Sequence, residues 1–214
     1  MLTVFPLLCG PLNNCVYVLI DQATNQAAVI DPGWSATIIQ ECLDQNQATL
    51  AMVLLTHIHF DHLNACDDLL SLTNAKDIPI MVSKEAQSVF RKYPNQTQFV
   101  EHKQQIWCGE SLIHVIHTPG HSKSCQSFYH QPYVFTGDCL FTDRVGRCDL
   151  QESNIQSMYN SLEQLKRLPD KTIVYPGHKY KEQTEQTLGE IKQNNRFLSC
   201  SDVNYFTKLV LKLK

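Results

Sequence analysis

Four side chains that can bind a metal ion lie within a stretch of six residues. They are His57, His59, Asp61 and His62. The run follows the apolar segment Ala51 to Leu55 and precedes a predicted helix that begins near Leu63, so its side chains can converge beyond the end of a strand. Histidine and aspartate without cysteine favour a divalent ion such as zinc, iron or manganese. The spacing therefore predicts a metal site.

Three later polar residues follow predicted strands in the same way. They are His121 in Thr-Pro-Gly-His-Ser, Asp138 in Thr-Gly-Asp and His178 in Pro-Gly-His. A Gly or Pro beside each of them lets the chain turn sharply at that point. Alone, each residue is more typical of a turn or a helix cap. In this order behind the first run, we expect all three to bind metal.

Apolar and β-branched runs bounded by Gly, Pro, Asn or Asp predict the strands that carry these turns. We expect strands at Cys15 to Ile20, Ala27 to Ile30, Met52 to Thr56, Ile80 to Val82, Leu112 to His117, Tyr133 to Thr136 and Thr172 to Tyr175, and a first strand within Met1 to Gly10. Apolar residues three or four apart predict helices at Ser35 to Asn46, Leu63 to Leu72, Lys84 to Lys92, Asn154 to Arg167 and Glu182 to Asn194. Ser35 is a suitable N-cap, and Pro169 should end the fourth helix.

The order of these elements predicts an α/β fold. Early strands are hairpin-like and later ones alternate with helices, which favours sheets covered by helices on their outer faces in an αββα arrangement. The 214 residues show no low-complexity linker and no short-period repeat, so we expect a single domain over residues 1–214. Within Leu198 to Lys214, the residues Lys208, Lys212 and Lys214 could mark a membrane-surface or partner helix. We expect a short element packed on the domain instead.

Composition limits the classes of partner. A formal net charge of -3 at pH 7 argues against nucleic acid or an anionic membrane. No run approaches the roughly 20 apolar residues of a membrane helix, and the apolar N-terminal stretch lacks the positive residue and the length of a secretion signal. The nine cysteines are odd in number and form no CxxC pair, which is typical of reduced thiols. We therefore expect a cytoplasmic protein that acts on a small molecule.

The ordered motifs HxHxDH, TPGHS, TGD and PGH resemble those of the metallo-β-lactamase superfamily. The likeness extends to Asn14-Cys15 and Ile30-Asp31-Pro32-Gly33, so it covers nearly the whole chain. It implies the fold of that superfamily, an αββα four-layer sandwich. We expect Asp31 to support a turn or a ligand rather than to bind metal.

The resemblance also implies a site for two metal ions. The ligands it implies are His57, His59 and His121 for the first ion, Asp61, His62 and His178 for the second, and Asp138 as a bridge. Asp61 and Asp138 are then the expected catalytic carboxylates. Zinc is the expected metal, with iron or manganese as alternatives. Two ions about 3.5 to 4 Å apart would hold a bridging hydroxide as the nucleophile.

Two further stretches are similar to the glyoxalase II branch. They are 137–141 (GDCLF) with 146–149 (GRCD), and 176–180 (PGHKY) with 195–198 (NRFL). The likeness implies that Arg147 and Tyr180 help to hold a glutathione-type thiol, with S-lactoylglutathione as the type substrate. A thiolate, with a pKa of about 8.5, can leave without a general acid, so we expect hydrolysis of a hydroxyacyl thioester. The short C-terminal segment and Cys148-Asp149 depart from that branch, which leaves the thiol carrier open.

Three other functions compete with this one. A mononuclear iron persulfide dioxygenase needs two histidines and one carboxylate, which His57, His121 and Asp138 can supply. A lactone or phosphoester hydrolase would keep the fold and change the substrate. Metal content distinguishes the dioxygenase, and relative rates on matched thioesters and lactones distinguish the second hydrolase. A non-catalytic binding module is disfavoured because the ligand set is intact.

Overall fold

Strand β2 (Asn14–Asp21) is buried along its whole length. Its odd-numbered residues from Cys15 to Leu19 belong to a core that also contains residues of a second sheet. Its even-numbered residues from Val16 to Ile20 belong to a separate core shared with helices. Because successive side chains of a strand point to opposite faces, this pattern places the sheet between a helical layer and another sheet.

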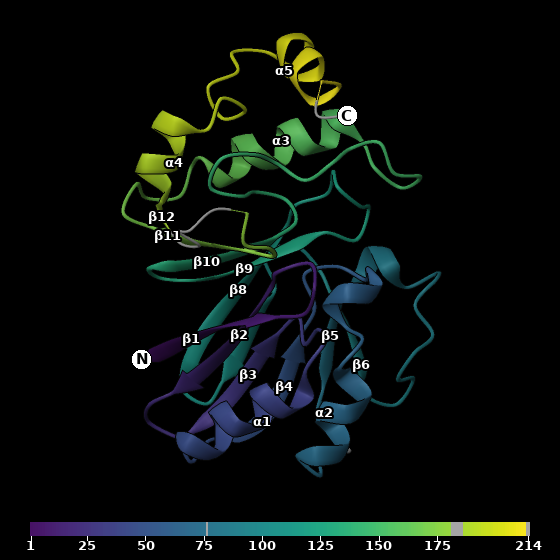
Figure 1. Cartoon of the computed structure of the whole chain (residues 1–214), viewed down its shortest axis with the longest axis vertical. Helices are drawn as coiled ribbons and strands as arrows, with labels where there is room; N and C mark the ends of the chain where they lie inside the picture. The colour runs from purple at the N-terminus through teal and green to yellow at the C-terminus, as the bar shows by residue number, and fades with distance from the viewer. Residues whose placement is uncertain (76, 181–185, 213–214) are drawn as a thin grey trace.

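The computed structural model describes residues 1–75, 77–180 and 186–212. Its two six-stranded sheets lie face to face, and helices cover both outer faces (Figure 1). This arrangement is the αββα four-layer sandwich predicted from the sequence, and the α/β fold class is confirmed. In the described part of the chain, no helix combines the length and the apolar character that crossing a bilayer would require.

The first sheet has the strand order β1-β2-β3-β4-β5-β6. Its other strands are β1 (Leu2–Cys9), β3 (Gln26–Ile30), β4 (Thr49–Leu54), β5 (Ile80–Ser83) and β6 (Thr97–Val100). The first three strands pair antiparallel, and β3 to β6 pair parallel. Helices α1 (Ala36–Gln45) and α2 (Cys66–Leu72) lie on its outer face (Figure 1).

The second sheet has the order β12-β11-β10-β9-β8-β7. Its strands are β7 (Gln105–Cys108), β8 (Ser111–His117), β9 (Gln126–His130), β10 (Tyr133–Gly137), β11 (Ile173–Pro176) and β12 (Gln186–Thr187). Helices α3 (Ile155–Leu165), α4 (Leu188–Asn194) and α5 (Val203–Val210) cover it (Figure 1). Strands β7 to β10 pair antiparallel, β10 and β11 pair parallel, and β11 and β12 pair antiparallel. Hairpins therefore open both halves of the described chain, not only the first half as predicted.

Two predicted helices form with the expected caps. Helix α1 begins after Ser35, whose hydroxyl accepts a hydrogen bond from an amide of the first turn. Helix α3 begins after Asn154, which caps its first turn in the same way, and it ends at Leu165, ahead of Pro169. Each cap satisfies an amide that a helix leaves unpaired at its start. The short C-terminal helix α5 packs on the second sheet's outer core through Phe206, as expected for that segment.

The helix predicted at Lys84 to Lys92 is wrong, because only a 3₁₀ turn forms there, at Lys84–Ala86. The guanidinium of Arg91 donates to two carbonyls of the preceding turn, which helix amides would otherwise use. Pro94 lies close behind, and a proline disfavours helical backbone at the residue before it. Local side-chain hydrogen bonds thus replace the helix.

Two other predicted helices begin late. The one expected from Leu63 begins at Cys66, because the Ala65 amide donates instead to the carbonyl of Pro32. Of the helix expected at Glu182 to Asn194, residues 182–185 lie outside the described residues. Gln186 and Thr187 form β12, and α4 starts at Leu188 with a capping box. The sequence pattern also did not predict β6, β7 and β9.

A buried carboxylate links the two sheets by hydrogen bonds. It lies away from the strand ends that carry the predicted ligands. Asp21, at the end of β2, is fully buried. It accepts hydrogen bonds from the hydroxyl of Ser111 at the start of β8 (2.6 Å) and from the amide and hydroxyl of Thr24. Burial alone would raise the pKa of Asp21, but these hydrogen bonds outweigh burial and lower the pKa from 3.8 to about 2.

We predict that Asp21→Ala lowers the free energy of unfolding at pH 7 by about 1–3 kcal/mol, because Ser111 and Thr24 lose their acceptor. The folded-state pKa lies below the unfolded one, so this stabilisation is complete above about pH 4 and is lost as the pH falls toward 2. Urea unfolding at pH 7 and pH 3 measures both effects. Gln22→Ala, at the exposed neighbour, should change the stability by less than about 0.5 kcal/mol. Equal stability of the two variants at pH 7 would contradict the assignment.

Candidate metal centre

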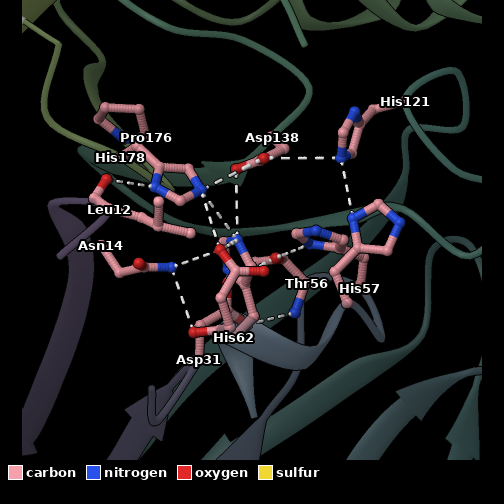
Figure 2. Close-up of polar contacts among 12 residues, drawn as sticks. Leu12, Asn14, Asp31, Thr56, His57, His62, His121, Asp138, Pro176 and His178 are labelled. Atoms are coloured by element: carbon pink, nitrogen blue, oxygen red, sulfur yellow. Dashed lines mark hydrogen bonds and ion pairs between the residues drawn. The ribbon is translucent and has the colours of Figure 1, made fainter. Parts of the chain in front are cut away.

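All seven predicted ligands lie near the carboxyl ends of strands, where both sheets meet. Figure 2 shows His57, His62, His121, Asp138 and His178 gathered there. The first four of the seven ligands follow β4, three of them in or just before the 3₁₀ turn Phe60–His62. His121 follows β8, Asp138 follows β10 and His178 follows β11. The structure therefore brings together side chains that are up to 121 residues apart in the chain, from His57 to His178.

One group consists of His57, His59 and His121, whose candidate ligand atoms all lie within 4.8 Å of one another. His59 Nδ1 and His121 Nε2 lie 3.0 Å apart. The three ring centroids lie 4.6, 5.3 and 4.7 Å apart. Three imidazole nitrogens at this spacing suit one divalent ion.

A second group consists of Asp61, His62 and His178, again within 4.8 Å of one another. His178 Nε2 lies 3.4 Å from Asp61 Oδ2 and 3.2 Å from His62 Nε2. Asp138 lies between the two groups. Its Oδ1 is 3.5 Å from His62 Nε2, and its Oδ2 is 3.5 Å from His121 Nε2 and 3.4 Å from His178 Nε2. A single carboxylate therefore faces both histidine groups.

The outer nitrogens of four histidines are held by hydrogen bonds. His62 Nδ1 donates to Asp31 (2.9 Å), His121 Nδ1 to the carbonyl of Arg147 (3.0 Å) and His178 Nδ1 to the carbonyl of Leu12 (3.0 Å). His57 Nδ1 lies 3.0 Å from the hydroxyl of Thr56. Such bonds fix the ring orientation and leave Nε2 as the inward-facing lone pair, as at metal sites.

Asp31 is one of the residues that hold the ligand imidazoles in place by hydrogen bonds. Its carboxylate accepts hydrogen bonds from the Thr56 amide (2.7 Å), the Thr56 hydroxyl (2.5 Å) and His62. Asp31 also lies close enough to His57 and His62 to be counted with them as a third group, but its oxygens are already used by these donors. Because the Thr56 hydroxyl gives its proton to Asp31, it accepts one from His57 Nδ1. This agrees with the expectation that Asp31 supports a ligand.

The donor atoms fit a bound cation. Among the described residues, His57 Nε2 and Asp138 Oδ1 are buried atoms with no hydrogen-bond partner. The Nε2 atoms of His62 and His178 face each other at 3.2 Å although both Nδ1 atoms already donate elsewhere. Two lone pairs at that distance repel each other unless a proton or a cation lies between them. The residues therefore fit a metal ion on grounds independent of the motif.

The electrostatics of the two groups differ. Burial, then the neighbouring imidazoles, lowers the pKa of His57 and of His59, so both rings are neutral, the form that binds metal. Burial also acts to lower the pKa of His62, but Asp138, Asp31 and Asp61 outweigh it and raise that pKa to about 9. The same negative potential that favours a proton on His62 favours a cation there.

Asp138 itself stays ionised. Burial would raise its pKa, but His62, His178 and His57 outweigh burial and lower it well below the usual range. A buried carboxylate that remains charged among histidines is an anionic ligand ready for a cation.

The two predicted substrate-binding residues lie next to these groups. The ring of Tyr180, half exposed, stacks on His178 with centroids 5.8 Å apart and meets Phe141 edge-on at 4.9 Å. Arg147 contributes its carbonyl to His121, whereas its exposed guanidinium pairs with Asp149 at 2.8 Å. The structure thus places Tyr180 directly on a candidate ligand. The side chain of Arg147 lies in solvent at the edge of the metal centre, and this edge is here called the rim.

Sequence reasoning missed two residues of this rim. The guanidinium of Arg144 lies 4.8 Å above the Tyr180 ring. The buried side-chain amide of Asn195 donates to the carbonyls of Phe141 and Arg144, both at 3.1 Å, and so holds the turn that carries them. Asn195 belongs to the NRFL stretch noted in the sequence, which was the one available signal. Nothing in the sequence marked Arg144.

Gly177 shows how tightly the centre is packed. A Cβ atom at this position would lie 2.4 Å from Asp138 Oδ1 and 2.9 Å from His62 Cε1. Contacts this short do not occur, so any other residue would displace the carboxylate that faces both groups. The Gly of the Pro-Gly-His motif is therefore required by this close approach, since its backbone φ lies outside the left-handed region.

We predict that Gly177→Ala weakens zinc binding by about tenfold to a hundredfold, the usual effect of disturbing the surroundings of a metal ligand. Competition with a chromophoric chelator measures the affinity. Gly189→Ala, in helix α4, is the control and should bind zinc as the unchanged protein does. Circular dichroism checks that both variants fold. Undiminished affinity in a folded Gly177→Ala protein would contradict the packing argument.

Comparison with known proteins agrees with this geometry. A family model described as "Metallo-beta-lactamase superfamily" matches residues 10–178. The chain is 33% identical over 205 residues to a hydroxyacylglutathione hydrolase of Pelagibacter ubique, covering 94% of this chain and 77% of the relative. It is 28% identical over 200 residues to a probable polyketide biosynthesis zinc-dependent hydrolase, PksB, of Bacillus subtilis, covering 93% and 87%. The crystal structure of ETHE1 from Myxococcus xanthus superposes with a TM-score of 0.88 at 30% identity, covering 99% and 91%.

Proposed function

The chain belongs to the metallo-β-lactamase superfamily as a metal-dependent hydrolase, and we propose that it hydrolyses a thioester by means of two metal ions. The observation that carries this proposal is the single buried carboxylate of Asp138, which faces both histidine groups within 3.5 Å. A carboxylate shared in this way favours a pair of adjacent ions over one isolated ion.

The proposed ligands are those expected from the sequence. They are His57, His59 and His121 for one ion, Asp61, His62 and His178 for the other, and Asp138 for both. Zinc is the proposed metal, because imidazole and carboxylate donors suit it and the PksB relative is named as a zinc-dependent hydrolase. Two bound ions would lower the pKa of a water molecule and polarise the carbonyl of the substrate. Asp61 and Asp138 are the proposed catalytic carboxylates.

The residues of the chain itself orient these groups. Asp31, through His62 Nδ1, and the carbonyls of Arg147 and Leu12 hold three imidazoles with Nε2 toward the centre. Asn14 donates from its amide to Asp61 Oδ2 at 2.9 Å and so fixes that carboxylate. Ligands fixed in advance need little rearrangement when the substrate binds.

A thioester suits this centre, because a thiolate leaves without a proton donor. Tyr180, stacked on His178, and the guanidinium groups of Arg144 and Arg147 are proposed to hold the thiol carrier. The Pelagibacter relative is named for hydrolysis of a hydroxyacylglutathione, which makes S-lactoylglutathione the first substrate to test. We also propose a cytoplasmic location, because small thiol conjugates of this kind occur inside cells and because the cysteines fit a reducing compartment.

One other activity is favoured by a specific observation. The similarity to ETHE1 over nearly the whole chain supports a second candidate function. This function is that of a mononuclear iron persulfide dioxygenase, with His57, His121 and Asp138 as the ligands. The shared position of Asp138 between two complete groups supports the hydrolase over this alternative. A lactone or phosphoester substrate has no comparable support.

We predict that zinc-loaded protein hydrolyses S-lactoylglutathione and that Asp138→Asn lowers kcat/KM by about a hundredfold or more, because losing a ligand should have at least the effect of disturbing its surroundings. Loss of absorbance from the thioester measures the rate. Asp170→Asn, at an exposed aspartate (75% of its side chain), is the control and should keep the rate within about twofold.

The dioxygenase is tested on the same preparations. Iron-loaded protein that consumes oxygen with glutathione persulfide, together with no thioester turnover by the zinc- or iron-loaded protein, would overturn the proposed function.

A further inference from the structure

Three apolar side chains stand beside the candidate metal ligands. The ring of Phe60, between His59 and Asp61 in the chain, is 72% exposed, and Leu12 is 53% exposed. Trp34 meets the Phe60 ring edge-on with centroids 6.4 Å apart. We propose that Leu12, Trp34 and Phe60, here called the apolar arc, bind the acyl group of the thioester and make the enzyme selective for apolar acyl groups. This inference rests on the proposed function and names its substrate class.

Hydrogen bonds connect one end of the apolar arc to Asp61. Trp34 Nε1 donates to Asn14 Oδ1 at 2.7 Å, and Asn14 Nδ2 donates to Asp61 Oδ2 at 2.9 Å and to the Asp61 carbonyl at 3.1 Å. The indole ring also lies directly on the backbone of Gly10, where a Cβ atom would be 2.2 Å from Trp34 Cγ. The Trp34 ring is therefore held firmly, at a fixed position relative to a proposed ligand.

The other end of the apolar arc is connected to His178. The carbonyl of Leu12 accepts the hydrogen bond of His178 Nδ1 at 3.0 Å (Figure 2). The next carbonyl, of Asn13, accepts one from the Lys179 amide at 2.9 Å. These bonds hold the loop between β1 and β2 against the chain that carries His178. The apolar arc thus borders the group formed by Asp61, His62 and His178.

The chemistry of the apolar arc favours a hydrocarbon over a polar group. Its three side chains carry one polar atom, Trp34 Nε1, and Asn14 already accepts the proton of that atom. They offer nothing to the hydroxyl of a lactoyl group. Each methylene that they remove from water would raise kcat/KM by up to about fourfold.

The position of the apolar arc beside the candidate ligands identifies the part of the substrate that binds to it. The Leu12 carbonyl binds His178 Nδ1, and Phe60 adjoins Asp61 in the chain, so the atoms attached to a carbonyl that reacts beside Asp61 and His178 lie near both residues. The carrier has a chemically different surface in the second half of the chain, formed by Tyr180 with Arg144 above its ring. The acyl chain is therefore the part of the substrate that matches the apolar arc.

The test is a series of straight-chain acyl thioesters of glutathione, from acetyl to hexanoyl, with the lactoyl ester alongside. In the zinc-loaded protein, kcat/KM should rise by about two- to fourfold per methylene, and the propionyl ester should exceed the lactoyl ester. Phe60→Ser should flatten this dependence on chain length. Trp107→Ser, at an exposed aromatic residue of β7, should leave it unchanged.

The outcomes separate the two proposals. Hydrolysis with no dependence on chain length, or a dependence that Phe60→Ser leaves intact, would overturn the apolar arc and leave the thioesterase standing. No hydrolysis of any ester would overturn the proposed function.

Binding gives a second readout that needs no turnover. Trp34 and Trp107 are the two tryptophans of the chain, so Trp107→Phe leaves Trp34 as the only one. Titration with S-hexylglutathione, which cannot be hydrolysed, should change the fluorescence of Trp34 at concentrations at least tenfold lower than S-methylglutathione. Equal concentrations, or no change with either thioether, would contradict binding to the apolar arc.

Discussion

The carboxylate of Asp138 is buried among histidines from both sheets, with three imidazole nitrogens at 3.4–3.5 Å. An ionised group with so little access to water is unfavourable unless positive charge compensates it. Each half of the chain supplies part of that environment, since His57 and His62 follow β4 while His121 and His178 follow β8 and β11. The face-to-face packing of the sheets is therefore what creates the site, and the ligands in turn require the two halves to meet in one register.

The surrounding hydrogen bonds explain why the imidazoles hold this arrangement. Asp31, whose carboxylate takes both donors of Thr56, also orients His62. Backbone carbonyls of Leu12 and Arg147 orient His178 and His121. Because the two carbonyls lie in loops that also form the rim, the same segments position the ligands and shape the surface that a substrate meets. In the proposed function, the ligands and the specificity of the enzyme are thus coupled through two loops.

The sequence predicted the four-layer fold and the residues that converge, because strand periodicity is local and the HxHxDH motif places four ligands in six residues. It could not predict contacts between distant segments, such as Leu12 with His178 or Asn195 with the turn of Arg144. Strand β9 was missed because Gln126 and Ser127 look exposed in sequence, whereas both are buried and Gln126 donates to the carbonyl of Leu55. The spacing of apolar residues predicted a helix at Lys84 to Lys92, but the helix does not form there, because Arg91 donates to carbonyls that helix amides would use.

A pair of adjacent ions at Asp138 is tested by the number of zinc ions bound per chain at saturation, determined by elemental analysis after removal of unbound metal. We predict about two ions per chain in the unchanged protein, because two groups of three ligands share Asp138. We expect fewer than two in Asp138→Ala, which lacks the shared carboxylate. One ion per chain in the unchanged protein, with the same number in the variant, would contradict a paired site.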